Sequence, residues 1–294
     1  MTGDTGSPLS ALFERARAEG RAVLVGYLPA GYPTVTAAAT ALRAMVDAGV
    51  DAVEVGLPYS DPLMDGPTIQ RAVDAALRTG TTTVDVLRTV EAVASAGTPT
   101  VVMSYWNPIA RYGAERFARD LAAAGGSGVV TPDLIPDEAA GWLPSARDHR
   151  LDTVFLVAPS STDERIALTV EACRGFVYAA STMGVTGARA RVGDAAATLV
   201  ARTRRATDLP VAVGLGVSTG GQAAEVAGFA DGVIVGSAFV RCLLDADDVA
   251  AGAAAAAALA AELAGGVRQA GNNLAGRRGL AAGSDHVKER SDEP

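Results

Sequence analysis

The chain has 294 residues, of which 49% are hydrophobic and only 5% aromatic, and its formal net charge is −8. This length suits one large domain, and the apolar fraction allows a sizeable core filled mainly by alanine, valine and leucine. The acidic charge argues against a nucleic-acid partner, because binding to a phosphate backbone requires clustered lysine and arginine.

Neither a membrane segment nor a metal site is predicted. Residues 1–10 lack the basic segment and apolar core of a signal peptide. No run of about 18 apolar residues appears, and Glu262 interrupts the alanine-rich stretch Ala250–Ala264. Cys173 and Cys242 lie far apart without metal-ligand spacing, so we expect two buried thiols. These features predict a cytoplasmic protein.

Short apolar runs alternate with segments of helical periodicity along the chain. A helix is expected first, at about Leu9–Glu19. The predicted strands are Ala22–Tyr27, Ala52–Gly56, Thr100–Ser104, Gly128–Val130, Thr153–Val157, Gly175–Tyr178, Val211–Val213 and Gly232–Val235. The helical segments between them include Val35–Asp47, Val84–Ala94, Ala114–Ala124, Asp163–Cys173 and Ala195–Ala206. Most of the strands are apolar on both faces, which is typical of parallel strands covered by helices.

Eight strands alternating with helices predict a single α/β domain, a (β/α)8 TIM barrel with an additional N-terminal helix that plugs the barrel bottom. An open doubly wound sheet is the alternative, although about six strands are more usual there and no Gly-x-Gly-x-x-Gly follows the first strand. The barrel is predicted to span residues 1–264. Residues 265–294 are rich in Gly, Ala, Arg and acidic residues without periodicity, and we expect them to form a disordered tail.

Lysine and histidine are almost absent from the chain. The single lysine, Lys288, lies in the polar tail, yet Schiff-base aldol chemistry, covalently held pyridoxal phosphate and a P-loop each need a lysine inside the fold. His149 stands in a polar run before a strand and is interpreted as a solvated loop residue, and His286 lies in the tail. Proton transfer is therefore expected to depend mainly on Asp, Glu and Tyr.

Two carboxylates follow one another at the end of the second predicted strand, where barrel active sites lie. Glu54 alternates with Val53 and Val55, so its side chain should point into the barrel. Burial there would raise its pKa and let it carry a proton near neutral pH; a structural ion pair or a hydrogen-bonded buried acid is the alternative. Asp61 and Asp65 stand in the Pro- and Gly-rich loop that follows. Both are also typical helix caps or turn formers, but the company of Glu54 favours a function for Asp65.

Glycine clusters follow the sixth, seventh and eighth predicted strands, at Gly184–Gly187, Gly214–Ser218 and Gly236–Ala238. Barrel enzymes commonly bind phosphate in this region through backbone N–H groups and the N-terminus of a short helix. Each cluster alone could form an ordinary turn. The three together predict a phosphate site that needs no lysine.

Residues 54–70, Glu-Val-Gly-Leu-Pro-Tyr-Ser-Asp-Pro-Leu-Met-Asp-Gly-Pro-Thr-Ile-Gln, resemble the loop-two signature of tryptophan synthase alpha subunits. Further similar segments are Gly26–Pro33, Thr131–Leu134, Phe155–Pro159, Gly175–Tyr178, Gly184–Ala188, Val211–Gly216 and Asp231–Ser237. The resemblance spans about Leu9 to Leu263 in the correct order. It implies a carbon–carbon lyase that cleaves indole-3-glycerol phosphate by a retro-aldol reaction into indole and D-glyceraldehyde 3-phosphate, with no cofactor and no metal in this subunit.

The resemblance also implies roles for individual residues. Glu54 matches the family's acid–base glutamate, and Asp65 matches the aspartate that accepts a hydrogen bond from the indole N–H. Thr186 matches a loop-six threonine that couples closure of the site to Asp65. The other implied substrate-binding residues are Tyr27, Met103, Tyr105, Tyr178 and Leu215, and the implied phosphate ligands are Gly187, Gly216, Gly236 and Ser237.

The resemblance further implies a partner, a beta subunit that carries pyridoxal phosphate and receives indole for L-tryptophan biosynthesis in an α2β2 heterotetramer. The positions that match partner-facing residues are Pro33, Asp61, Asn107, Pro108 and Asp133. Tyr32 stands where an aspartate is common, and Met64 replaces a usual small residue; both could alter contact with the beta subunit or the mobility of the loop.

Three rival functions stay open. A stand-alone indole-3-glycerol phosphate lyase would use the same residues and release indole freely. A barrel acting on another phosphorylated substrate, such as an isomerase, disagrees with the loop-two sequence. A non-catalytic activator of a beta subunit would have lost its acid–base pair, and both Glu54 and Asp65 are present.

Overall fold

The computed structural model describes residues 6–181, 189–214 and 216–284, and nine parallel strands form its centre. The strands are β1 (Val23–Pro29), β2 (Ala52–Gly56), β3 (Thr100–Met103), β4 (Gly128–Val130), β5 (Asp152–Val154), β6 (Leu156–Val157), β7 (Val177–Ala180), β8 (Val211–Gly214) and β9 (Gly232–Val235). They are ordered β5-β4-β3-β2-β1-β9-β8-β7-β6. The predicted strands therefore all form, each within a few residues of its expected bounds.

The sheet closes into an eight-stranded barrel because β5 and β6 are two halves of one strand, separated only by Phe155. The Thr131 N–H donates to the Val154 carbonyl at 3.2 Å on one side, and the Tyr178 N–H donates to the Phe155 carbonyl at 3.1 Å on the other. This strand thus joins β4 to β7. The predicted (β/α)8 barrel is confirmed, with a break in its fifth strand that the apolar run Thr153–Val157 did not reveal.

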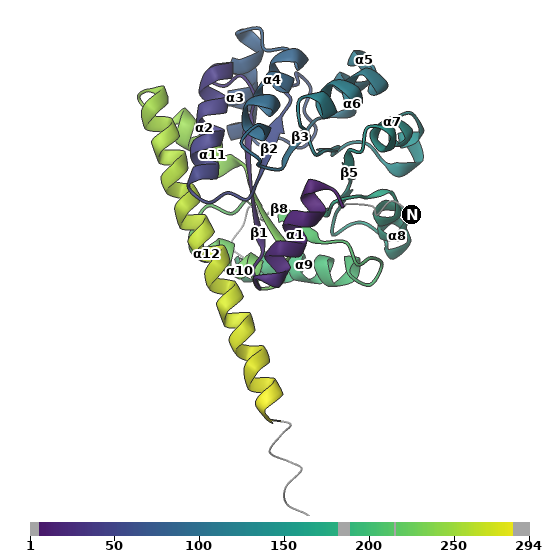
Figure 1. The fold of residues 1–294 in the computed structure, drawn as a ribbon, viewed down its shortest axis with the longest axis vertical. Helices are drawn as coiled ribbons and strands as arrows, with labels where there is room; N and C mark the ends of the chain where they lie inside the picture. The colour runs from purple at the N-terminus through teal and green to yellow at the C-terminus, as the bar shows by residue number, and fades with distance from the viewer. Residues whose placement is uncertain (1–5, 182–188, 215, 285–294) are drawn as a thin grey trace, which may run out of the picture.

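Helices surround the barrel on its outside, and the N-terminal one covers an end of it (Figure 1). They are α1 (Pro8–Ala18), α2 (Val35–Asp47), α3 (Pro67–Arg78), α4 (Thr83–Ala94), α5 (Trp106–Tyr112), α6 (Ala114–Ala123), α7 (Leu143–Asp148), α8 (Asp163–Ala172), α9 (Arg189–Thr203), α10 (Gly220–Ala227), α11 (Ser237–Leu244) and α12 (Val249–Ser284), with a 3-10 turn at Pro136–Gly141. Threonine begins four of them: Thr34, Thr82, Thr162 and Thr219 each accept a hydrogen bond from a backbone N–H of the first turn of α2, α4, α8 and α10. The sequence thus marks where these helices start.

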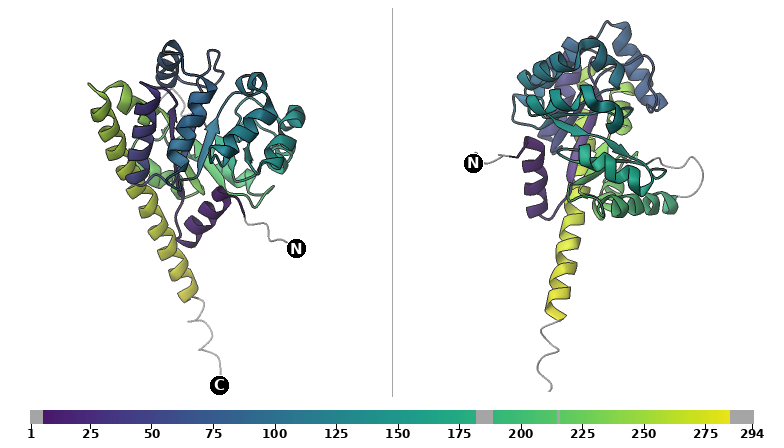
Figure 2. Two further views of the ribbon diagram at one scale, coloured as in Figure 1. Left: turned by 45° about the horizontal axis from the view of Figure 1, so that its top comes forward. Right: turned by 90° about the vertical axis from the view of Figure 1, so that its right-hand side faces the viewer.

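The two faces of the strands pack into separate layers. Outward residues such as Val53, Val55 and Val102 meet the surrounding helices. Inward residues such as Val25, Ala52 and Val101 pack instead with Leu12 and Phe13 of α1. The N-terminal helix therefore closes one end of the barrel, as predicted, and Figure 2 shows it against that end.

A buried carboxyl group ties α1 to the barrel. Ser7 is the N-cap residue of α1, and its hydroxyl donates to Asp152 at the start of β5 at 2.5 Å while accepting from the Ser10 N–H at 3.1 Å. Gly128 and Gly175 make room for Asp152: a Cβ atom on Gly128 would lie 2.8 Å from the Cβ of Asp152, and one on Gly175 would lie 2.9 Å from its carboxylate. The plug helix is thus fixed both by apolar packing and by one polar contact.

The helix α12 extends beyond Ala264, the predicted end of the barrel domain. It continues without a break through residues 265–284, and Val267 and Ala270 are buried against the rest of the chain. Gly266 lies against α10 so closely that a Cβ atom there would be 2.0 Å from the Gly220 carbonyl oxygen. Val267 and Ala270 thus pack against the rest of the chain, and Gly266 permits the close packing of α12 on α10.

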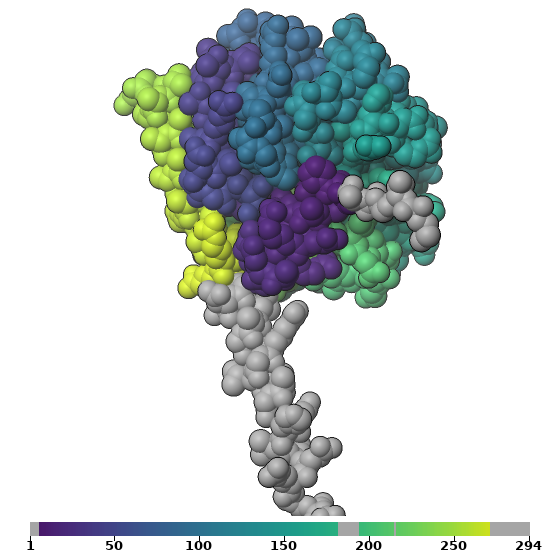
Figure 3. Space-filling model, viewed as in Figure 1, coloured from purple at the N-terminus to yellow at the C-terminus, as the bar shows by residue number. Residues whose placement is uncertain are grey.

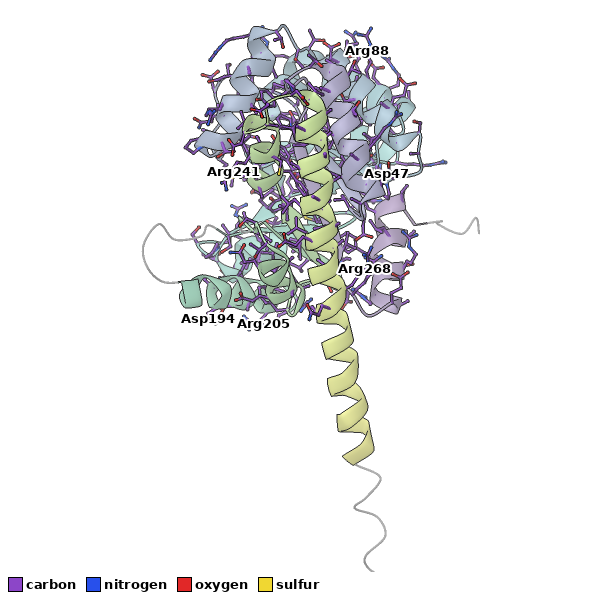
Figure 4. All side chains as sticks on the ribbon, turned by 90° about the vertical axis from the view of Figure 1, so that its left-hand side faces the viewer. Asp47, Arg88, Asp194, Arg205, Arg241 and Arg268 are labelled. Atoms are coloured by element: carbon purple, nitrogen blue, oxygen red, sulfur yellow. The ribbon has the colours of Figure 1, made fainter. Side chains whose placement is uncertain are left out.

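Composition and length alone would allow α12 to cross a membrane, since Val249–Ala270 has a mean hydropathy of 1.5. The packing of α12 against the barrel also explains its high hydropathy, because one side of the helix is buried. Ala256, Ala260, Leu263 and Val267 form one buried stripe, and the helix contacts α2, α10 and α11. Figures 3 and 4 show it along the outside of the barrel, where it runs between α11, labelled at Arg241, and α2, labelled at Asp47. The helix is thus an outer helix of the barrel.

Candidate active site

A cavity of about 460 Å³ opens at the carboxyl ends of the barrel strands, where the sequence predicted the site. The barrel residues that line it are Tyr27, Glu54, Met103, Val130, Leu156, Tyr178, Ala180, Gly214 and Ile234. The loops after the strands add Met64, Asp65, Gly66, Pro132, Ser181, Gly216 and Gly236, and two helices add Ile69 and Ser237. The structure thus brings most of the predicted substrate and phosphate residues to one place.

Glu54 lies at the cavity with 3% of its surface exposed. Its neighbours Val53 and Val55 pack outward against the helices, so the alternation of β2 turns the carboxyl group inward, as predicted. Burial, together with the nearby charge of Asp65, raises the pKa of Glu54 to about 8. None of the ion pairs within the described residues includes Glu54, so the ion-pair alternative has no support.

Asp65 reaches the same cavity from the loop between β2 and α3, which is held from behind by Tyr105. The Tyr105 hydroxyl donates to the Asp65 carboxylate at 3.2 Å and accepts from the Met64 N–H at 2.9 Å. The Gln70 amide donates to the Asp65 carbonyl at 2.8 Å. Burial raises the pKa of Asp65, and the hydrogen bond from Tyr105 opposes that rise.

The position of Tyr105 differs from the one predicted from the sequence. It was expected to line the substrate pocket, but it is 2% exposed and is not among the cavity-lining residues. Its ring packs behind the loop at 5.6 Å from the ring of Tyr59. Tyr105 therefore positions Asp65 and does not form the cavity wall.

Two glycines, Gly56 and Gly214, make room for the two cavity tyrosines, a role that was not predicted for either of them. A Cβ atom on Gly56 would lie 2.4 Å from the Tyr27 hydroxyl, and one on Gly214 would lie 2.3 Å from the Tyr178 hydroxyl. Both pairs obey one register rule: Tyr27 pairs with Glu54 and Tyr178 with Ala212, and each glycine stands two residues further along the neighbouring strand. Strand pairing combined with this spacing is the signal that would have found them.

The phosphate end of the predicted site is present in part among the described residues. Gly216, Gly236 and Ser237 line the cavity, whereas Thr186, Gly187 and Leu215 lie outside the described residues. Gly236 is the N-cap of α11 and supplies no side-chain cap, so the first N–H groups of that helix have no side-chain acceptor from this position. A helix N-terminus of this kind attracts an anion. Within the described part of the chain, no group of three His, Cys, Asp or Glu residues could hold a metal ion.

The five positions expected to face a partner do not share one depression. Asp61, Asn107 and Pro108 line a hollow of about 520 Å³ beside the loop, where the Asn107 amide donates to the Tyr59 hydroxyl at 3.0 Å. Pro33 lines a separate hollow between α2 and α11. Asp133 accepts a hydrogen bond from the Trp106 N–H at 2.9 Å, so it also stabilises the start of α5.

Known proteins are similar to this chain in sequence and in fold. The family model described as tryptophan synthase alpha chain matches residues 13–268. A tryptophan synthase alpha chain of Acidothermus cellulolyticus is 65% identical over 255 residues, which cover 87% of this chain and 95% of the relative. One of Salinispora arenicola is 63% identical over 262 residues, covering 89% and 98%.

Solved structures of related chains have a similar three-dimensional fold. A crystal structure of tryptophan synthase from M. tuberculosis in its aminoacrylate-bound form contains a chain that superposes with a TM-score of 0.82 at 55% identity, covering 89% of this chain and all of that one (100%). Tryptophan synthase subunit alpha from Legionella pneumophila gives a TM-score of 0.80 at 31% identity, covering 91% and 99%. These matches confirm the resemblance drawn from loop two. The chain belongs to the tryptophan synthase alpha chain family.

Proposed function

We propose that this chain is the alpha subunit of a tryptophan synthase, a carbon–carbon lyase that cleaves indole-3-glycerol phosphate into indole and D-glyceraldehyde 3-phosphate. The observation that carries the proposal is the pair formed by Glu54 and Asp65 on one cavity. One is an acid buried on a barrel strand, and the other comes from the following loop. Two carboxyl groups in different environments suit two different roles in proton transfer.

In the proposed mechanism Glu54 begins as the protonated acid, in keeping with its raised pKa. It donates its proton to C3 of the indole ring, and the positive charge that develops on the ring is stabilised by a hydrogen bond from the indole N–H to Asp65. The Glu54 carboxylate then accepts the proton of the adjacent glycerol hydroxyl. The bond between C3 and the glycerol carbon breaks, its electron pair returns to the ring, and the hydroxyl becomes the aldehyde. Glu54 ends in its starting state, so the reaction consumes no proton.

The other residues of the cavity would position the substrate so that its indole ring faces Glu54 and Asp65. The N-terminus of α11 at Gly236 and Ser237, together with Gly216, would bind the phosphate through backbone N–H groups and one hydroxyl, with Gly187 as a further expected ligand. Tyr27, Met103 and Tyr178 would enclose the indole and glycerol parts, and Leu215 is expected beside them. Thr186 is expected to close loop six over Asp65 and exclude water.

The proposal includes a partner. A beta subunit would hold the pyridoxal phosphate and take up indole in L-tryptophan biosynthesis, in an α2β2 heterotetramer in the cytoplasm; this subunit would need no cofactor. The hollow at Asp61, Asn107 and Pro108 lies beside the loop that carries Asp65, so a partner seated there would act directly on the catalytic loop. Pro33 and Asp133 would extend the contact on either side.

The test is indole release from indole-3-glycerol phosphate by wild type and Glu54→Gln, each with and without a matching beta subunit. We expect slow cleavage by wild type alone, faster cleavage with the beta subunit, and loss of at least a thousandfold in Glu54→Gln under both conditions. Fast cleavage by wild type that ignores the beta subunit would instead identify a stand-alone lyase. Full activity of Glu54→Gln would refute the mechanism, and activation of a beta subunit without any cleavage would identify a non-catalytic partner.

A further inference from the structure

The ring of Tyr27 lies across the ends of two neighbouring strands. One edge faces Gly236, where a Cβ atom would lie 3.2 Å from the ring Cδ1. The hydroxyl and the opposite edge lie over Gly56, where a Cβ atom would be 2.4 Å from the oxygen. Since β9, β1 and β2 are adjacent in the barrel, the ring spans the space between the start of α11 and the strand that carries Glu54.

The Tyr27 hydroxyl lies at the cavity and has no hydrogen-bond partner among the described residues, yet it is not one of the fully enclosed unpaired side-chain atoms, which belong to Thr131 and Trp142. Among the described residues, the hydroxyls of Tyr59, Tyr105 and Tyr112 have hydrogen-bond partners, whereas those of the two cavity tyrosines, Tyr27 and Tyr178, have none. Tyr27 is 5% exposed and lines the cavity. A hydroxyl at a cavity wall that has no partner in the surrounding residues can be satisfied by solvent or by a ligand. Burial raises the pKa of Tyr27 well above its ordinary value, and the charges of Asp65 and Glu54 raise it further, so the hydroxyl keeps its proton and is a donor.

The position of this donor indicates which part of a ligand it meets. In the proposed function, the phosphate lies at Gly236 and Ser237 and the reacting indole carbon lies at Glu54. The three-carbon glycerol chain connects these two points, so it must pass the ring of Tyr27. We propose that the Tyr27 hydroxyl hydrogen-bonds a hydroxyl of the glycerol chain and thereby makes the site selective for a hydroxylated chain. This inference rests on the proposed function and assigns a specificity-determining residue to it.

The test compares two ligands that differ only in the chain hydroxyls. They are indole-3-glycerol phosphate and 3-(indol-3-yl)propyl phosphate, which keeps the ring and the phosphate but lacks both hydroxyls. Dissociation constants are measured by calorimetry in the Glu54→Gln background, where the substrate stays intact. Tyr27→Phe removes one oxygen atom and keeps the ring, and thermal unfolding of each variant is compared first. Tyr32→Phe is the matched control, because Tyr32 lines a different hollow.

We expect Tyr27→Phe to weaken binding of indole-3-glycerol phosphate about tenfold, the usual effect of one lost hydrogen bond. Binding of the propyl phosphate should stay within a factor of two, and Tyr32→Phe should change neither. Equal weakening of both ligands would show that only the ring matters and would overturn the inference, as would no weakening of either.

These outcomes are distinguishable from failure of the proposed function. If wild type cleaves indole-3-glycerol phosphate while Tyr27→Phe treats both ligands alike, the inference alone fails. If wild type neither binds nor cleaves indole-3-glycerol phosphate, with or without a beta subunit, the proposed function and the inference both fail.

Discussion

Glu54 carries a proton at neutral pH because of the residues around it. An exposed glutamate has a pKa near 4.5, whereas burial between β1 and β3 and the charge of Asp65 raise that of Glu54 to about 8. At pH 7 the acid form therefore predominates. A proton donor is what the first step of the proposed cleavage requires, so the apolar surroundings of this one residue prepare it for catalysis.

The pH dependence of cleavage tests this account. Since only protonated Glu54 can donate to the indole carbon, the single-turnover rate should be constant from pH 6 to about 7.5. It should then fall about tenfold for each pH unit above 8, as the acid form is lost. The measurement is rapid-quench cleavage of saturating indole-3-glycerol phosphate by the isolated chain. A rate that stays constant to pH 9.5, or one that rises with pH, would contradict the assignment of Glu54 as the acid.

At the scale of single elements, α1 shows how a polar contact supplements apolar packing. Its inner face fills the barrel bottom, while its N-cap Ser7 donates to the buried Asp152. Burial raises the pKa of Asp152 to about 6, and the hydrogen bond from Ser7 opposes that rise. A carboxyl group whose pKa is raised in the folded state stabilises the protein most below its unfolded-state pKa near 3.8, and this stability is lost as the pH rises through about 6.

Ser7→Ala should therefore destabilise the protein more at high pH than at low pH. At pH 8 Asp152 is ionised and loses the donor that stabilises its charge, so we expect a loss of about 2–3 kcal/mol. At pH 5.5, where the protonated form predominates, we expect about 1 kcal/mol, the ordinary cost of a lost helix cap. Urea unfolding at the two pH values measures both.

Thr34→Ala is the matched control for Ser7→Ala. Thr34 caps α2 by accepting from the Ala37 N–H at 3.2 Å, without a buried carboxylate behind it. It should cost about 1 kcal/mol at both pH values. An equal pH response of the two variants would show that Asp152 does not depend on Ser7.

Local pattern was sufficient to predict most elements of the fold. The strands appear as apolar runs and the helices as segments of helical periodicity, so the eight-stranded barrel and the bounds of α2, β2, β4 and β9 follow from neighbouring residues alone. The inward direction of Glu54 also follows, because it depends only on the alternation of β2. The break at Phe155 was not predicted, because the apolar run Thr153–Val157 does not show that its first half pairs with β4 and its second half with β7.

Contacts between distant segments account for what the sequence did not predict in the site. Gly56 and Gly214 stand at strand ends, and nothing in the adjacent sequence indicates their role. Only the strand register shows that a tyrosine lies over each of them. Tyr105 was assigned to the pocket wall from resemblance, but its direction depends on where the loop carrying Asp65 settles. In each case the missing information is which residue lies opposite in space.

At the scale of the whole molecule, the two ends of the barrel have different tasks. The carboxyl ends of the strands carry the cavity with Glu54 and Asp65, and the opposite end is closed by α1. Around the outside, α12 covers the seam between the last strands of the chain and the first, since it contacts α10 and α11 on one side and α2 on the other. Glu262 adds a polar contact to this seam by accepting from the Gly220 N–H at 2.7 Å. The cover over this seam thus depends on how closely α12 approaches α10.

Substitution of two adjacent glycines of α12 tests how closely this helix packs against α10. At Gly266 a Cβ atom would lie 2.0 Å from the Gly220 carbonyl oxygen, and a backbone atom cannot move aside as a flexible side chain can. Gly266→Ala should therefore force the two helices apart and lower the free energy of unfolding by about 1–3 kcal/mol. Gly265 faces solvent with no atom within 4 Å of its Cβ position, so Gly265→Ala should raise that free energy by about 0.5–1 kcal/mol through helix propensity alone. The same substitution at neighbouring positions thus has opposite expected signs in urea unfolding. If both variants were stabilised equally, residues beyond Ala264 would not be packed against α10, and the barrel would end where the sequence pattern first placed its boundary.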